Sequence, residues 1–205
     1  MRRHQRAWTL IEILVVMALG GVVLLVVTRL FESTNKVTQV QTQRALLQGQ
    51  LQSVLWELEQ SLQGACSAGI AWRPASAGQP AILVVHPYQT GAINLQPQWS
   101  PYWRCFIWDQ AGQALYFKQI PPGPPALSAP SVGQPQIPTS ADMAQIGLNP
   151  SQAGKLLSNS VSNITYAREV GPLVRISVEL EKSIPNRVKT EKFYAERLFQ
   201  LRNRP

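Results

Sequence analysis

The longest apolar stretch of the chain lies close to its start, from Trp8 to Thr28, and contains one charged residue, Glu12. A helix of about 20 apolar residues, rising about 1.5 Å per residue, spans a hydrocarbon core of about 30 Å. Inside lipid the backbone must satisfy its own hydrogen bonds, so we expect a helix here although valine is frequent. The pattern therefore predicts a transmembrane helix at residues 8–28.

After this stretch, apolar residues recur every three or four positions. They lie at Val37, Val40, Leu47, Leu51, Val54, Leu58 and Leu62, in a segment without proline. This spacing predicts that the helix continues, as an amphipathic helix, over residues 29–64. Gly20 and Gly21 form its expected soft point, because glycine lowers helix propensity. A coiled coil would use the same apolar stripe, but the stripe is short and a following sheet would cover it better.

Beyond residue 64 the period of three to four residues ends, and short runs rich in apolar residues indicate strands. The expected strands are Ala81–His86, Arg104–Trp108, Ala114–Gln119, Ser162–Arg168, Leu173–Glu181 and Lys189–Leu201. Residues 109–112 should form the turn that joins the second and third strands into a hairpin. In the fifth strand apolar residues at even positions alternate with polar residues at odd positions, so one face should be buried and the other wet. The buried face needs a cover, and the stripe at residues 37–62 is the long apolar surface available.

Two segments interrupt the strands. Residues 120–140 are rich in proline, which excludes a helix or an internal strand, so we expect an exposed loop there. A short polar helix is expected at Ser151–Leu157. The whole pattern predicts an α+β fold, in which one long N-terminal helix packs on an antiparallel β-sheet within a β-rich domain at residues 65–205.

Charge sets the expected direction of the helix in the membrane. Arg2, Arg3 and Arg6 directly precede the apolar stretch, and basic residues that flank a membrane helix stay on the cytoplasmic side. The sequence therefore predicts a single-pass inner-membrane protein with a cytoplasmic N-terminus and a periplasmic C-terminal domain. The small residue Ala7 lies before the apolar stretch, whereas the cleavage site of an ordinary secretory signal peptide lies after it.

The segment R-A-W-T-L-I-E at residues 6–12 resembles the class III signal of type IV prepilins and type II secretion pseudopilins. In that family a membrane-embedded aspartyl peptidase cuts after a small residue, and the new first residue is N-methylated. The resemblance implies a leader at residues 1–7, cleavage between Ala7 and Trp8, and methylation of the Trp8 amine. Alanine replaces the family's usual glycine, which can slow processing, and tryptophan replaces its usual phenylalanine.

Glu12 occupies the fifth mature position, where the family has a glutamate. A charged side chain in hydrocarbon costs about 2.5–3.5 kcal/mol on insertion scales, so something must compensate for it. In the family this glutamate pairs with the N-terminal amine of a neighbouring subunit, which implies a role in subunit assembly. The alternative is that Glu12 lies one turn from the membrane interface and reaches the headgroup region.

The predicted layout is similar to that of pilins, and Val161–Leu180 resembles J-type minor pseudopilins and related minor pilins. This resemblance implies a structural subunit that helps to initiate or cap a periplasmic filament of a type II secretion or type IV pilus machine. The implied partners are other pseudopilins or pilins of the filament, prepilin peptidase and the inner membrane.

A DNA-binding minor pilin of a competence pilus is the alternative function. Basic residues gather near the end of the chain, at Lys182, Arg187, Lys189, Lys192, Arg197, Arg202 and Arg204. Such side chains can neutralise phosphates. A solvated strand face explains the same residues, so nucleic acid is not an expected partner.

Cys66 and Cys105 both fall in the part of the chain that would be exported. An oxidising compartment favours a disulfide between them, which would tie the end of the helix to the sheet. The alternative is a pair of free, buried thiols.

No enzymatic activity and no cofactor are expected, because the sequence has no nucleophile-elbow, zincin, P-loop or dinucleotide-binding motif. His4 leaves with the leader, so His86 would be the remaining histidine, and we expect it at a strand end instead of in a metal site. Four tryptophans lie close together in the sequence, at Trp72, Trp99, Trp103 and Trp108. They could form a binding platform, although large aromatic residues more often belong to a core.

Overall fold

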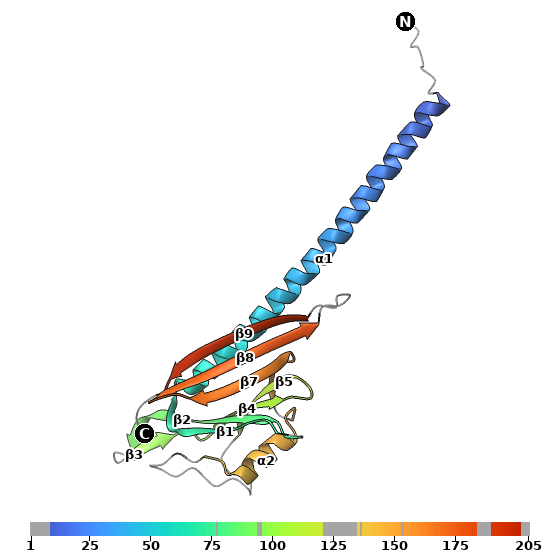
Figure 1. Cartoon of the computed structure of the whole chain (residues 1–205). Coiled ribbons are helices and arrows are strands. Elements are labelled where there is room, and N and C mark those ends of the chain that lie inside the picture. The colour runs from blue at the N-terminus through green and yellow to red at the C-terminus, as the bar shows by residue number, and fades with distance from the viewer. Residues whose placement is uncertain are drawn as a thin grey trace. The chain divides into compact units, whose positions relative to one another are not determined.

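The computed structural model describes residues 9–76, 78–93, 96–120, 135, 137–152, 154–183 and 190–201. Its helices are α1 (Leu10–Leu62) and α2 (Ser140–Leu148). Its strands are β1 (Ala65–Arg73), β2 (Ala81–Ile93), β3 (Gln96–Trp99), β4 (Trp103–Asp109), β5 (Ala114–Ile120), β6 (Lys155–Ser158), β7 (Val161–Arg168), β8 (Leu173–Ser183) and β9 (Thr190–Gln200). The chain divides into two compact units, residues 1–45 and residues 46–205 (Figure 1).

The first unit consists of the N-terminal part of α1. Its exposed apolar side chains extend from Leu10 to Phe31. Among the described residues, α1 is the one helix that is long and apolar enough to cross a membrane, and none of its apolar window is buried in the structure. Gly20 and Gly21 are helical, so the expected soft point does not interrupt the helix. This exposed apolar surface is consistent with a single membrane anchor.

The strands of the second unit form two antiparallel sheets (Figure 1). The larger sheet has the order β1-β2-β4-β5-β6, with β3 paired to β2, and the smaller sheet has the order β7-β8-β9. β4 and β5 pair along their whole length, which confirms the hairpin predicted at residues 109–112. All six predicted strands are present, and β2 extends beyond its predicted end to Ile93.

The smaller sheet has one buried face and one wet face, as its sequence predicts. The even-numbered residues of β8 from Val174 to Leu180 are buried, whereas the odd-numbered residues from Arg175 to Glu181 are partly exposed. This alternation puts the apolar side chains from Val174 to Leu180 on one side of the sheet. The buried side chains belong to the same core as the C-terminal turns of α1.

The C-terminal turns of α1 lie at the centre of the main core. Their buried side chains are Leu47, Leu51, Val54, Leu55, Leu58 and Leu62. These residues pack with Leu83 and Phe106 of the larger sheet, and with Ile176 and Val178 of the smaller one. The α+β fold is thereby confirmed, a long N-terminal apolar helix packed against antiparallel β-structure, with two sheets where one was predicted.

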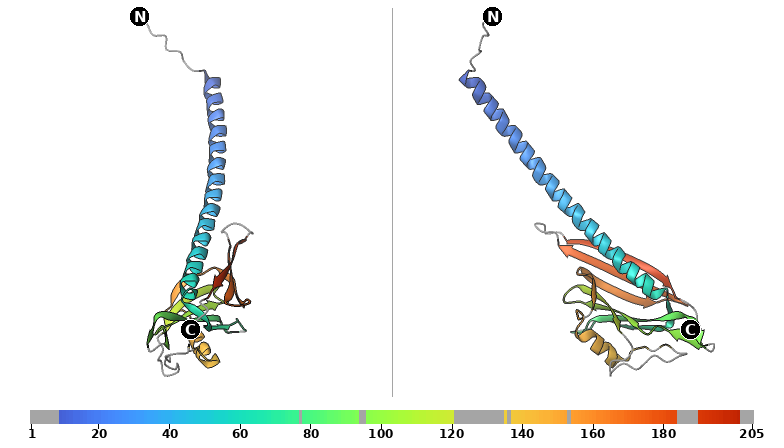
Figure 2. Two further views of the ribbon diagram at one scale, coloured as in Figure 1. Left: turned by 90° about the vertical axis from the view of Figure 1, so that its left-hand side faces the viewer. Right: turned by 180° about the vertical axis from the view of Figure 1, so that it is seen from behind.

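A second core covers the opposite face of the larger sheet. It contains Ile82, Val84, Trp103, Cys105 and Ile107 from the strands, together with Met143 and Ile146 from α2. Figure 2 shows α2 across the larger sheet from the C-terminal turns of α1. A capping box starts α2, because the Thr139 side chain accepts from the Asp142 backbone N–H and the Asp142 carboxylate accepts from the Thr139 N–H.

The helix predicted at Ser151–Leu157 is wrong. A turn and strand β6 occupy the part of this segment that the structure describes, and β6 pairs with β5. Ladder hydrogen bonds to β5 outweigh the local helix propensity of so short a segment. The helix of this region, α2, begins earlier, directly after Thr139. Residues 121–134 and 136 of the predicted proline-rich loop lie outside the described residues.

The structure does not contain the disulfide predicted between Cys66 and Cys105. Both cysteines are free and buried. Cys66 lies in β1 and Cys105 in β4, and β2 lies between these two strands. Neighbouring strands are about 4.8 Å apart, so strands separated by a third are about 9.6 Å apart. A disulfide needs Cα atoms closer than about 7 Å. The strand order therefore keeps the two thiols apart.

Replacing Leu58 by alanine should destabilise the second unit by about 2–5 kcal/mol, because Leu58 is fully buried between α1 and the sheets. Thermal unfolding of the full-length protein in detergent, followed by the β-sheet circular dichroism signal, measures this loss. Trp56→Ala is the control on the same helix, since Trp56 is 58% exposed, and it should change stability by less than about 1 kcal/mol. Equal losses in the two variants would contradict the buried face assigned to α1.

Both cysteines should react with a thiol reagent in denaturant without reductant, giving two labels per chain by mass spectrometry. In the folded protein labelling should be slow, because burial excludes the reagent and raises the pKa of the Cys105 thiol to about 12. Denatured protein from an oxidising compartment that carried no reactive thiol would show that a bridge forms, and the strand order would then be wrong.

Candidate functional site

The candidate site is the beginning of α1. The predicted cleavage residues, Ala7 and Trp8, lie outside the described residues. The described chain begins at Thr9, whose carbonyl accepts a hydrogen bond from the Ile13 backbone N–H at 3.3 Å, the first bond of the helical ladder. Thr9 is therefore the N-cap residue, and Glu12 occupies the third helical position.

Thr9 and Glu12 form a capping box. The Glu12 Oε2 atom accepts a hydrogen bond from the Thr9 backbone N–H at 2.9 Å and from the Thr9 hydroxyl at 3.1 Å. In return, the Glu12 backbone N–H donates to Thr9 Oγ1 at 3.3 Å. The first N–H groups of a helix have no partner within the helix, and each unsatisfied group costs several kcal/mol in lipid. The box satisfies two of them without water.

The Glu12 carboxylate has neutral hydrogen-bond partners in this arrangement. Both groups that donate to Oε2 are neutral and belong to Thr9. The other oxygen, Oε1, accepts no hydrogen bond from the part of the chain that the structure describes, and Glu12 forms no ion pair there. The neighbouring side chains are apolar and exposed, Leu10 to 79% and Ile11 to 73%. The site therefore presents one carboxyl group, at the positive end of the helix dipole, in an apolar surface.

The capping box was readable from the sequence but was overlooked. Thr9 and Glu12 have the spacing of the S/T-x-x-E pattern that precedes an apolar helical run. The cost of a charge in hydrocarbon alone predicts compensation from outside the chain, by a neighbouring subunit or by the headgroup region. The structure shows that part of the compensation, the hydrogen bonds, comes from within it.

The tryptophans do not form a binding platform among the described residues. Trp99, Trp103 and Trp108 are all buried, and the Trp108 indole N–H donates to the Val161 carbonyl at 3.0 Å. Trp72 stacks on Tyr166 with ring centroids 5.7 Å apart. The expectation that these aromatic residues belong to the core is therefore confirmed.

His86 lies within β2 instead of at a strand end, and it is fully buried. Its Nε2 atom is 2.9 Å from the Ser100 carbonyl, which can only accept, so Nε2 carries the proton. The ring packs against Trp99 and Trp103, with centroid distances of 5.2 Å and 6.5 Å. The described residues contain no group of three His, Cys, Asp or Glu side chains that could hold a metal ion.

Two of the C-terminal basic residues are engaged in ion pairs. Lys192 contacts Glu181 at 3.0 Å and Glu179 at 3.3 Å, and hydrogen bonds to these carboxylates raise the pKa of Lys192. Arg197 contacts Glu59 of α1 at 2.9 Å. Arg187, Lys189, Arg202 and Arg204 lie outside the described residues. Charges that are already paired give phosphate binding little support.

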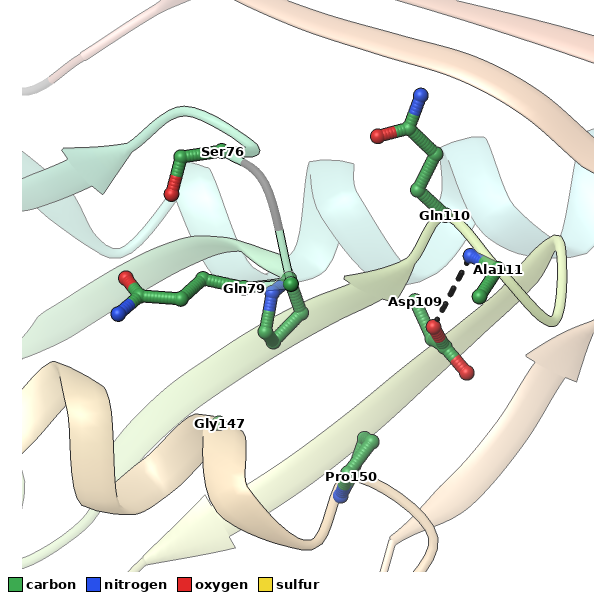
Figure 3. A pocket seen from close by; sticks show the side chains of 9 residues that line it. Ser76, Gln79, Asp109, Gln110, Ala111, Gly147 and Pro150 are labelled. Carbon is green, nitrogen blue, oxygen red and sulfur yellow. Dashed lines mark hydrogen bonds between the residues drawn. The ribbon is translucent and has the colours of Figure 1, made fainter.

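A pocket of about 420 Å³ lies where the β1–β2 loop, the β4–β5 hairpin and the end of α2 meet. Its lining includes Ser76, Gln79, Gln110, Gly147 and Pro150, as Figure 3 shows. Among the described residues that line it, Asp109 is the charged one, and its carboxylate accepts a hydrogen bond from the Ala111 N–H at 3.1 Å. This contact is typical of an Asx turn and explains the position of Asp109 by the hairpin alone.

Comparison with known proteins identifies the segment around the capping box. No curated protein and no solved structure matches the chain significantly. Residues 2–28 match the family described as the prokaryotic N-terminal methylation motif. The match includes the basic residues before the helix, the Ala7–Trp8 position, the capping box and the apolar part of α1 as far as Thr28. The chain thus carries, at residues 2–28, the signature of type IV pilins and pseudopilins.

Proposed function

We propose that the chain is a minor pseudopilin or minor pilin, a structural subunit that helps to initiate or cap a periplasmic filament. The observation that carries this proposal is the methylation motif at residues 2–28, joined to an exposed apolar helix that continues into a pilin-like α+β domain. An exposed apolar helix needs lipid or a protein partner to cover it. Type IV pilins and pseudopilins, whose signature the motif is, place this helix in the membrane before assembly and against other subunits in the filament.

The proposed processing follows from the position of the motif. Prepilin peptidase would cleave between Ala7 and Trp8, and the Trp8 amine would be methylated. Cleavage there removes residues 1–7 and keeps the whole of α1, so the mature subunit remains anchored. Its amine would lie one residue before the N-cap Thr9, close in the chain to the Glu12 carboxylate.

The proposed topology rests on charge and on α1. Arg2, Arg3 and Arg6 would hold the leader in the cytoplasm, residues 8–28 would cross the inner membrane, and residues 29–64 would continue the helix into the periplasm. Residues 65–205 would form the periplasmic β-rich domain. In this arrangement both buried cores lie in the exported part of the chain.

The proposed partners are other pilins or pseudopilins, bound in part through Glu12. A carboxylate that is held through one oxygen and has no cationic partner attracts a cation strongly where little water screens it. The N-terminal amine of a neighbouring subunit is such a cation. A DNA-binding role draws no support from Lys192 and Arg197, whose charges are paired within the chain.

Mass spectrometry of the membrane-purified protein should find a mature chain that begins with N-methylated Trp8. An intact Met1 leader in a host with an active prepilin peptidase would contradict the proposed maturation.

Glu12→Gln should be inserted and processed like the wild type but should be recruited poorly to other filament subunits. Glutamine retains an oxygen that can complete the capping box and removes the charge. Glu12→Leu removes both, and it should insert at least as well because it eliminates an intramembrane carboxylate. Crosslinking in membranes at matched expression measures recruitment. If both variants are recruited as well as wild type, Glu12 is a tolerated interfacial residue without an assembly role.

A further inference from the structure

We propose that the pocket at one end of the larger sheet binds a guanidinium group, presented by an arginine side chain of another polypeptide. The pocket has a volume of about 420 Å³ and lies between the β1–β2 loop, the β4–β5 hairpin and the end of α2. This volume falls within the range of ligand sites, about 300–1,000 Å³. The proposal goes beyond the filament role and does not depend on it.

Asp109 supplies the charge of the pocket and is held through one of its two oxygens. Oδ1 accepts the hydrogen bond from the Ala111 N–H at 3.1 Å. Oδ2 accepts no hydrogen bond within the described residues, and Asp109 forms no ion pair there. Gly112 gives Oδ2 room, because a Cβ atom at that position would lie 2.8 Å from it. The turn needs a side-chain oxygen and would accept asparagine equally well, so it leaves the negative charge for a ligand.

The polar side chains around Asp109 are also available. Ser76, Gln79 and Gln110 line the pocket (Figure 3), and their side chains form no hydrogen bond within the described part of the chain. A carboxylate beside two amide oxygens and a hydroxyl offers several acceptors to one ligand. The guanidinium group carries five N–H donors in one plane and no acceptor, and it pairs well with carboxylates. The acceptors of the pocket therefore match the donors of arginine.

Two cations of the chain lie close to the pocket walls and are already engaged. The Arg73 Nη2 atom donates to the Pro80 carbonyl at 3.3 Å, and the Lys118 Nζ atom donates to the Asn149 carbonyl. Asn149 is the C-cap of α2, where the helix dipole favours a positive charge. Neither cation forms an ion pair with Asp109 among the described residues. The charge of Asp109 is therefore not neutralised from within this part of the chain.

The apolar part of the lining favours a side chain over a bare cation. Pro80 and Pro150 both line the pocket. The methylene groups of an arginine side chain can pack on such rings while the guanidinium reaches the polar groups. A metal ion would need several ligands of high charge, and the described residues contain no group of three His, Cys, Asp or Glu side chains. The lining is thus suited to a long side chain with a cationic end.

The test compares three probes on the full-length protein in a nonionic detergent, by ligand-observed NMR titration at low salt. The probes are N-acetyl-arginine amide, N-acetyl-citrulline amide and N-acetyl-lysine amide. Citrulline has the shape of arginine without its charge. Arginine should bind roughly tenfold more tightly than citrulline, the factor expected for charge-assisted hydrogen bonds. Lysine should bind about threefold or more weakly than arginine, because it has fewer donors.

Three variants assign the preference to the pocket. Asp109→Asn keeps an oxygen for the turn and removes the charge, so the preference for arginine over citrulline should fall to within about twofold. Gln110→Ala removes an exposed amide and should weaken arginine binding about threefold. It provides a second test of the pocket if Asp109→Asn fails to fold. Glu179→Gln is the control, because it makes the same change of net charge in the smaller sheet, where Lys192 keeps Glu181 as a partner at 3.0 Å.

Four outcomes would overturn the proposal. Equal binding of arginine and citrulline to the wild type would show that charge plays no part. Lysine that binds as tightly as arginine would contradict a guanidinium site. A folded Asp109→Asn variant that keeps the full preference would place the binding elsewhere. A Glu179→Gln variant that loses as much preference as Asp109→Asn would reveal an effect of net charge alone. None of these results bears on the processing at Trp8 or on Glu12, so the filament role is tested separately.

Discussion

The globular unit depends on the packing of one helix face, from Leu47 to Leu62, between two β-sheets. Each sheet has an apolar face that is unstable in water, and α1 covers both. The two sheets therefore share one core without having to stack on each other over their full area. The helix that stabilises the domain is also the helix whose N-terminal part is apolar and exposed. Folding of the domain and presentation of the anchor are thus properties of one continuous element.

The larger sheet is covered on both faces, which explains its composition. β2 contributes Leu83 to the core around α1, and its neighbour Ile82 to the core beneath α2. Strands buried on both sides have nearly continuous apolar sequences, unlike the strictly alternating β8. The same two-sided burial places Trp103 and His86 in the interior. An aromatic-rich segment that suggests a binding surface is here the consequence of central strands that are buried on both faces.

The elements that could be predicted from sequence are those with a strong local pattern, either a period or a short apolar run. α1 repeats every three or four residues, and β8 alternates along its central residues, so both were recognised. β1 was not recognised, because its first half, residues 65–69, consists of small residues that show no strand pattern. The need for a small residue at Gly69 comes from contacts with other strands. A Cβ atom there would lie 2.7 Å from the His86 carbonyl oxygen and 3.2 Å from the Trp99 ring. The disulfide was wrongly expected for a related reason. The order of strands is not a local property, and it separates Cys66 from Cys105.

At the start of α1, too, one part of the site could be predicted from the sequence and another part could not. The significance of Glu12 could be argued from the cost of a charge in lipid, but that cost has two components. One is the need for hydrogen-bond donors, and Thr9 meets it within the chain. The other is the need for an opposite charge, and no described residue meets it, since Glu12 forms no ion pair among them. A helix cap can satisfy the first need without touching the second. Such a carboxylate can be held within a single chain and still attract an opposite charge.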